Sequence, residues 1–347
     1  MRLAVLCHEK FPGRAKTAIG VMRYGENEVV AVLDRKNAGR RVSEFLPDVP
    51  DAPILSGMEE TLDAGIEVDA LLIGISPIGG GFEASWRPDV RSALEAGCDV
   101  LSGLHYFLSE DDEFRALAES SGSELRDLRK PPEDLTVGRG IAGDVDATIV
   151  LTVGTDCSVG KMTATCELLE AAREAGWDAG FVPTGQTGIA IEGEGVAIEG
   201  QGIAIDRVVS DFAAGAVERM IEKRGGREYL FVEGQGSIVH PAYSGVTCSI
   251  LHGAMPDALV LCHEAGREKI HGYEQFSLPS LSTYVDLYER LAAPVRDAPI
   301  VAGALNTRSI ENGREARRAI DSFAEEIGVP STDPVRFGAA ELLEAIR

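Results

Sequence analysis

The residues best suited to chemistry form a glycine-rich loop near the middle of the chain. An apolar run at Thr148 to Val153 leads into Gly154-Thr-Asp-Cys-Ser-Val-Gly-Lys-Met-Thr163, and a helix-forming stretch continues to Ala175. A strand, a glycine loop, a lysine and a helix in this order are typical of a P-loop, where backbone N–H groups, the helix N-terminus and the ammonium group hold phosphate oxygens. The alternative is a tight turn that ends in a lysine. We expect this loop to bind a phosphate-bearing ligand.

Two features distinguish this loop from the common P-loop. Five residues rather than four separate Gly154 from Gly160, and Met162 stands where a Ser or Thr normally binds Mg²⁺. Thr163 comes one position later and would point elsewhere on a helix. Such a loop can hold a diphosphate but is poorly equipped to move a γ-phosphoryl group. We assign no metal ligand, and we assign to the cofactor Gly154, Thr155, Asp156, Cys157, Ser158, Val159, Gly160, Lys161, Met162, Thr163 and Asn306.

Two candidate catalytic residues follow an apolar run that begins at Tyr229. Glu233 ends this run and precedes a flexible Gly-Gln-Gly-Ser turn, the place where P-loop proteins keep a metal-binding or catalytic acid. A structural hydrogen-bonding role is the alternative for Glu233. His240 comes shortly afterwards, and its imidazole is suited to accept a proton near neutral pH, although an isolated histidine often has a structural role. We interpret Glu233 and His240 as the catalytic pair.

Other polar residues stand where further strands are expected to end. Arg267 is suited to clamp a carboxylate or phosphate, and the amide of Asn306 is suited to read an adenine edge. The turn that contains Gln186 and Thr187 combines small hydroxyls with glycines, although an ordinary loop is an equal alternative. Asp211 lies at an expected helix start, where N-capping is the alternative. The substrate-binding residues predicted are Gln186, Thr187, Asp211 and Arg267.

Short apolar runs alternate with amphipathic stretches along the whole chain, which predicts an α/β fold with parallel sheets. A polar stretch at residues 126–134, with Pro131 and Pro132 inside it, is the expected linker. Helices are expected in the first half at residues 58–64, 88–96 and 111–120. The first strand is not followed by a GxGxxG pattern, so no dinucleotide site is predicted there. The expected strands cover residues 3–7, 29–34, 70–75, 99–102, 147–153, 179–183, 229–233, 258–262 and 299–305.

One short segment is duplicated, and another is rich in glycine. Residues 189–195 recur almost unchanged at 196–202, which favours a recent duplication in a surface hairpin over a binding device. The turn at residues 76–81 is rich in glycine, and a loop outside the sheet is the favoured interpretation.

The composition limits the possible partners and compartment. The chain has 33 Lys and Arg residues against 56 Asp and Glu residues, a formal charge of −23, which excludes nucleic acid and anionic membranes as natural partners. With only seven lysines among 347 residues, this surface is typical of a halophilic protein. Six scattered cysteines without a CxxC pair indicate neither disulfides nor zinc, and no apolar run suits a signal peptide or membrane span. We expect a cytoplasmic homo-oligomer that acts on a small molecule.

Several motifs together resemble the D-glutamate N-acetyltransferase-like family, long described as a domain of unknown function. The P-loop also resembles that of dethiobiotin synthetase, which shares the Gly-Thr-Asp opening and the five-residue gap but keeps the hydroxyl that Met162 replaces. The resemblance to the first family covers nearly the whole chain. Its motifs are the loop at 154–163, Gln-Thr-Gly at 186–188, Val-Ser-Asp-Phe-Ala-Ala-Gly at 209–215, the segment at 232–247, Leu-Asn-Thr at 305–307 and Asp-Pro-Val-Arg-Phe-Gly at 333–338.

This resemblance implies a Rossmann-like domain over residues 1–130 and a P-loop domain over residues 140–347. It implies transfer of acetyl from acetyl-CoA to the amine of D-glutamate, with the P-loop holding the diphosphate of coenzyme A. We expect Glu233 and His240 to take the proton of the amine, and the N–H groups of residues 234–237 to hold the oxyanion. Two alternatives remain: an ATP and Mg²⁺ dependent ligase or kinase of the dethiobiotin synthetase type, and a nucleotide-binding module without turnover.

Overall fold

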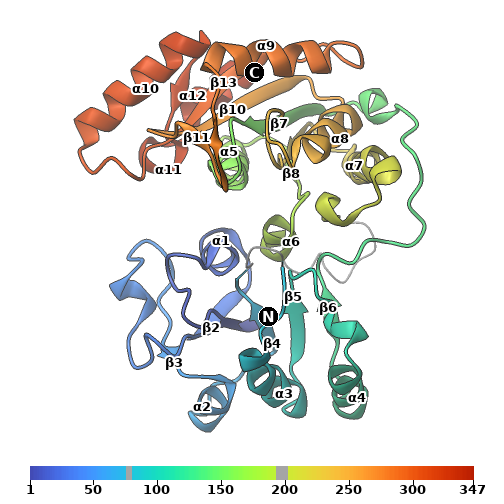
Figure 1. The fold of residues 1–347 in the computed structure, drawn as a ribbon, viewed down its shortest axis with the longest axis vertical. Coiled ribbons are helices and arrows are strands. Elements are labelled where there is room, and N and C mark those ends of the chain that lie inside the picture. The colour runs from blue at the N-terminus through green and yellow to red at the C-terminus, as the bar shows by residue number, and fades with distance from the viewer. Residues whose placement is uncertain (76–79, 193–201) are drawn as a thin grey trace. The chain divides into compact units, whose positions relative to one another are not determined.

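The chain divides into two compact units, each built around its own parallel sheet (Figure 1). The computed structural model describes residues 1–75, 80–192 and 202–347. The first unit comprises Met1–Pro131 and Gln186–Arg207, and the second comprises Pro132–Gly185 and Val208–Arg347. Most of the duplicated segment at 189–202 and of the turn at 76–81 lies outside the described residues, so those two predictions stay predictions.

The first unit is a six-stranded parallel sheet with the order β3-β2-β1-β4-β5-β6. This is the strand order of a Rossmann fold, which confirms the expected class of the first domain. The inner strands β1 and β4 are short, apolar and buried, as expected where helices cover both faces of a parallel sheet. The elements are β1 (Arg2–Leu6), α1 (Lys16–Tyr24), β2 (Glu28–Leu33), β3 (Ile54–Leu55), α2 (Met58–Asp63), β4 (Ala70–Ile73), α3 (Arg87–Glu95), β5 (Asp99–Ser102), α4 (Asp112–Ser121), β6 (Leu125–Asp127) and α6 (Gln186–Glu192).

The second unit is another six-stranded parallel sheet, with the order β14-β13-β10-β7-β9-β8. The elements are β7 (Thr148–Gly154), α5 (Lys161–Glu174), β8 (Ala179–Val182), α7 (Ser210–Arg224), β9 (Tyr229–Val232), α8 (Ser244–Ala254), β10 (Ala258–Glu264), β11 (Lys269–Ile270), β12 (Tyr273–Ser277), α9 (Leu281–Ala292), β13 (Ile300–Asn306), α10 (Gly313–Ile327), β14 (Ser331–Thr332), α11 (Pro334–Phe337) and α12 (Ala340–Ile346).

The strand that leads into the P-loop lies in the middle of the second sheet. β7 pairs with β10 on one side and with β9 on the other, in register through Val153↔Leu261 and Leu151↔Val232. The carboxyl ends of these strands meet at one edge, where open α/β sheets bind their ligands. The fold therefore brings the P-loop together with the turns that follow β9 and β10.

Several elements differ from those expected from the sequence. The linker prediction at 126–134 is partly wrong, because β6 continues through Asp127 and pairs with β5. The predictions also missed α1, the antiparallel hairpin β11-β12 and the two-residue strands β3 and β14. Two-residue strands carry too few side chains to show a period of two, so their pattern is invisible. Among the described residues, no helix combines the length and apolar character needed to cross a bilayer.

Candidate functional site

The loop between β7 and α5 has the backbone geometry of an anion-binding nest. Ser158 and Gly160 both adopt a positive φ, 58° and 112°, and α5 begins directly afterwards at Lys161. Left-handed residues next to right-handed ones turn successive N–H groups toward one point, and the first N–H groups of a helix lack intrahelical partners. The N-terminus of α5 adds positive potential. The loop can therefore hold a phosphate group through its backbone.

Lys161 is held over this loop before any ligand binds. Its ammonium group donates a hydrogen bond to the carbonyl oxygen of Asp156 at 2.8 Å, and the residue is buried. A Cβ at Gly154 would lie 2.9 Å from Lys161 Nζ, so any larger residue at this position would push the lysine side chain from its present place. The amine is placed to move onto phosphate oxygens.

Met162 faces the protein interior instead of the ligand. It is 5% exposed, and its sulfur accepts a long contact from the thiol of Cys166, 3.8 Å away and one helical turn on. A thioether is a weak acceptor and a poor ligand for the hard Mg²⁺ ion. The position that normally supplies the Mg²⁺ hydroxyl is thus part of the core.

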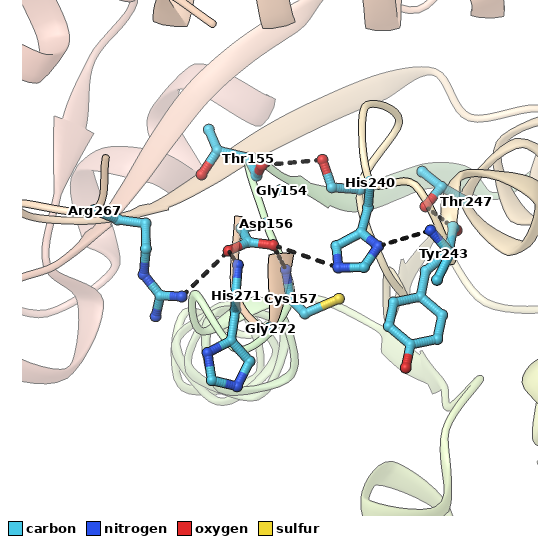
Figure 2. Close-up of polar contacts among 12 residues, drawn as sticks. Gly154, Thr155, Asp156, Cys157, His240, Tyr243, Thr247, Arg267, His271 and Gly272 are labelled. Atoms are coloured by element: carbon cyan, nitrogen blue, oxygen red, sulfur yellow. Dashed lines mark hydrogen bonds and ion pairs between the residues drawn. The ribbon is translucent and has the colours of Figure 1, made fainter. Parts of the chain in front are cut away.

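Asp156 ties the loop after β10 to the P-loop. Its carboxylate is fully buried, and Oδ2 accepts hydrogen bonds from Arg267 Nη1 at 3.2 Å and from the His271 N–H at 2.7 Å (Figure 2). Oδ1 accepts the N–H of Cys157 at 2.7 Å. Arg267 also donates to Glu264. The predicted substrate residue Arg267 therefore lies at the P-loop, already paired with two carboxylates.

His240 is buried against the same loop, as the sequence led us to expect. Its Nδ1 accepts the N–H of Ala242 at 3.1 Å, and its Nε2 lies 4.0 Å from Asp156 Oδ1. Because the Nδ1 lone pair is used, the neutral ring carries its proton on Nε2. Burial lowers the pKa of His240, and the charge of Asp156 only partly offsets this. In this arrangement the neutral ring of His240 is a donor at Nε2, whereas the sequence leads us to expect a base; the catalytic role of His240 stays a prediction.

Glu233 supports the turn after β8. Its Oε2 accepts the N–H groups of Thr184 at 3.2 Å and of Gly185 at 3.1 Å, and the residue is 2% exposed. This is the structural role that the sequence left open as the alternative to catalysis. One of the N–H groups expected to hold the oxyanion already has a partner. The N–H of Gly234 donates a hydrogen bond to Thr152 Oγ1 at 3.1 Å. This hydrogen bond joins the turn after β9 to β7.

Asp156, Cys157 and His240 place one possible metal ligand each within 4.8 Å of one another. A metal at His240 would need the Nε2 lone pair, whereas the bond from Ala242 leaves a proton on that atom. The ammonium group of Lys161 and the guanidinium of Arg267 also bond to Asp156 and oppose a cation electrostatically. These contacts oppose a metal ion at the cluster.

Three side chains that hold the P-loop were missed by the sequence analysis. Tyr284 and Tyr288 on α9 are fully buried and donate hydrogen bonds to the carbonyl oxygens of Thr155 and Gly154, at 2.8 and 2.7 Å. His263 Nδ1 is 2.8 Å from Thr155 Oγ1. The tyrosines are spaced one turn apart on an amphipathic helix, which a sequence shows only as core. They hold two carbonyl groups of the loop against α9.

His263 should make the stability of this unit depend on pH. Its pKa is lowered from 6.5 to about 4, chiefly by burial, against the opposing charges of Glu326 and Glu264. The unfolded chain binds the proton first, so stability is complete above pH 6.5 and decreases as the pH falls toward 4, by on the order of 3 kcal/mol. We expect the melting temperature to fall over this range, and to fall less in His263→Gln. An equal fall in both proteins would remove His263 as the cause.

The remaining predicted site residues fall in different places. Asn306 ends β13 beside the P-loop, since a Cβ at Gly160 would lie 3.8 Å from its Nδ2. Gln186 and Thr187 belong to α6 in the first unit, where Thr187 bonds Thr17. Asp211 is exposed in the first turn of α7, and Val209 is the N-cap, so the capping interpretation of Asp211 is wrong. Of the predicted substrate residues, Arg267 is the one with a contact to the P-loop among the described interactions.

Comparison with known proteins gives a consistent picture over nearly the whole chain. Two curated proteins named D-glutamate N-acetyltransferase are similar to it. The protein from Tritonibacter scottomollicae is 34% identical over 333 residues, which is 96% of this chain and 94% of the relative. The protein from Pseudoalteromonas sp is 36% identical over 285 residues, which is 81% of this chain and 82% of the relative.

Family models and a solved structure agree with these relatives. The P-loop domain of a family described as a domain of unknown function, DUF1611, matches residues 136–343, and the Rossmann-like domain of that family matches residues 35–131. A crystal structure of a DUF1611 family protein from Anabaena variabilis has a TM-score of 0.92 at 38% identity, covering 99% of this chain and 98% of that one. The chain therefore belongs to the DUF1611 family, the D-glutamate N-acetyltransferase-like family that its sequence motifs resemble.

Proposed function

We propose that this protein transfers acetyl from acetyl-CoA to the amine of D-glutamate, and that the P-loop holds the diphosphate of coenzyme A. The observation that carries this proposal is the P-loop with Met162 buried in place of the Mg²⁺ hydroxyl. Coenzyme A carries a diphosphate that must be bound but not cleaved. A loop with an anion nest and a lysine, without the usual metal hydroxyl, suits that task.

The relatives support the acetyl transfer and its acceptor. Two proteins named D-glutamate N-acetyltransferase share 34% and 36% identity with this chain over 96% and 81% of its length. In the proposed reaction the amine nitrogen bonds to the acetyl carbon, and the bond from that carbon to the sulfur of coenzyme A breaks. The leaving thiol takes up the proton that the amine loses. No phosphate bond is broken at any point.

The chain's own residues fit the phosphate end of coenzyme A. The nest at Ser158 and Gly160 offers backbone donors, and Lys161 offers a charge-assisted one. Asn306 lies beside Gly160, which supports the proposal that its amide contacts the adenine of coenzyme A. These groups bind and orient the cofactor, while α9 holds the loop in shape through the two tyrosine hydroxyls.

The dependence on metal separates acetyl transfer from the ATP-dependent alternative, because only the alternative requires Mg²⁺. We expect turnover with acetyl-CoA and D-glutamate, little with L-glutamate, and none with ATP and Mg²⁺ in place of acetyl-CoA. Because no metal enters the reaction, EDTA should leave the rate within about twofold of its original value. The measurement is product formation with each donor and acceptor pair, with and without EDTA. Loss of turnover on chelation, together with strict ATP dependence, would favour a ligase or kinase of the dethiobiotin synthetase type.

A further inference from the structure

One buried donor next to the P-loop lacks a hydrogen-bond partner. His240 Nε2 contacts no acceptor within hydrogen-bonding distance among the described residues, although the side chain is 1% exposed. A buried polar group without a partner costs about 1–3 kcal/mol, so native proteins seldom keep one without a reason. A ligand that supplies an acceptor would remove this cost. The unpaired N–H is therefore a candidate contact for a ligand.

The local structure fixes the chemical character of this atom. The N–H of Ala242 occupies Nδ1, and the ring packs between Tyr243 and Tyr273, with centroid distances of 4.6 and 5.2 Å. The two aromatic contacts prevent the ring from turning freely. Nε2 is consequently a fixed donor and cannot act as a proton acceptor or a metal ligand without breaking the bond from Ala242.

The donor points toward Asp156, a residue of the P-loop. Figure 2 shows His240 and Arg267 approaching Asp156 from opposite sides, and Nε2 lies 4.0 Å from Asp156 Oδ1. The ammonium group of Lys161, on the carbonyl oxygen of the same residue, adds a second positive group. An anionic oxygen entering the loop would meet donors from Lys161 and His240 together.

The length of coenzyme A decides which end of the cofactor meets this donor. About a dozen covalent bonds separate the diphosphate from the sulfur, an extended reach on the order of 15 Å at standard bond lengths. His240 lies next to Asp156, a residue of the loop itself. When the loop holds the diphosphate, an extended cofactor carries its thioester well beyond the imidazole. His240 is then placed to contact phosphate and not the acetyl group.

We propose that the Nε2–H of His240 donates a hydrogen bond to an anionic oxygen of the diphosphate, so that His240 positions coenzyme A. This inference rests on the proposed function, because it takes the diphosphate in the P-loop as given. In this proposal His240 donates a hydrogen bond to the cofactor, whereas the sequence leads us to expect that it acts as a base. The donor works without a change of charge and therefore does not require a proton transfer at this site.

Three variants separate this role from folding and from base catalysis. His240→Phe keeps a ring between the two tyrosines but removes the N–H, whereas His240→Gln can return an N–H near the Nε2 position. His252→Phe is the matched control, because His252 Nε2 makes a structural contact with the carbonyl oxygen of Leu291 at 2.8 Å. Melting temperatures of all three variants report on folding. Calorimetric Kd values for coenzyme A and for pyrophosphate report on the diphosphate contact.

We expect His240→Phe to raise both Kd values about tenfold, the usual effect of losing one hydrogen bond to a charged group, and His240→Gln to restore most of the affinity. S-acetylpantetheine is an acetyl donor that lacks the diphosphate, so the contact from His240 is not used with it. His240→Phe should then match the wild-type rate, whereas loss of a catalytic base would lower the rate with this donor as well. Unchanged Kd values for coenzyme A in folded His240→Phe, or a collapse of kcat with both acetyl donors, would overturn the assignment. Failure of the wild-type protein to bind coenzyme A and pyrophosphate at all would instead refute the proposed function.

Discussion

Lys161→Ala is expected to weaken the binding of coenzyme A at least tenfold. The ammonium group is buried over the loop, 2.8 Å from a loop carbonyl oxygen, and it is the lysine placed to meet the diphosphate there. A hydrogen bond from a charged group contributes about 1.5–3 kcal/mol, and 1.4 kcal/mol corresponds to a factor of ten in Kd. The measurement is the Kd for coenzyme A by calorimetry.

The control for this change is Lys36→Ala, which removes an exposed lysine from the first unit. It removes one positive charge, as Lys161→Ala does, and should leave the Kd for coenzyme A nearly unchanged. If Lys161→Ala stays folded and binds coenzyme A as tightly as the wild-type protein, Lys161 does not belong to the site.

Gly234→Ala is expected to damage both stability and binding. A methyl group at this position would lie inside van der Waals distance of the carbonyl oxygen of Thr152, and 3.3 Å from Lys161 Cδ. Backbone of β7 would have to move, and overpacking of this kind costs about 1–3 kcal/mol or more. We expect a melting temperature lower by about 5 °C, and a weaker affinity for coenzyme A because β7 leads directly into the P-loop.

Gly226→Ala provides the comparison, since a Cβ at Gly226 would meet nothing within 4 Å. Its melting temperature should stay close to that of the wild-type protein, measured in the same buffer. Equal melting temperatures for the two alanine variants would show that β7 and β9 approach less closely than the structure indicates.

Much of the fold follows from local patterns in the sequence. The strands β5 and β9 are buried apolar runs bounded by polar turns, so their positions were predicted to within a residue. The P-loop was predicted because its glycines, its lysine and its flanking strand and helix must occur together in sequence. In the sheet β9 pairs directly with β7, which brings the turn after β9 to the P-loop.

The rest depends on contacts that sequence distance hides. Tyr284 and Tyr288 reach the P-loop from a helix more than a hundred residues away, and only the packing of α9 reveals their hydroxyl bonds. The first unit contains a second segment, Gln186–Arg207, which interrupts the sequence of the second unit. The hydrogen bond from the Ala242 N–H to His240 Nδ1, which sets the tautomer of the neutral ring, is likewise a contact that a residue pattern cannot show.

The identity of the product tests the central claim most directly. Wild-type protein is incubated with acetyl-CoA that carries a deuterated acetyl group and with D-glutamate, in EDTA and without ATP, and products are followed by mass spectrometry. The account predicts deuterated N-acetyl-D-glutamate in equal amount to the coenzyme A released, with neither formed when the protein is omitted. Release of coenzyme A without N-acetylglutamate, or no reaction until ATP and Mg²⁺ are added, would contradict it.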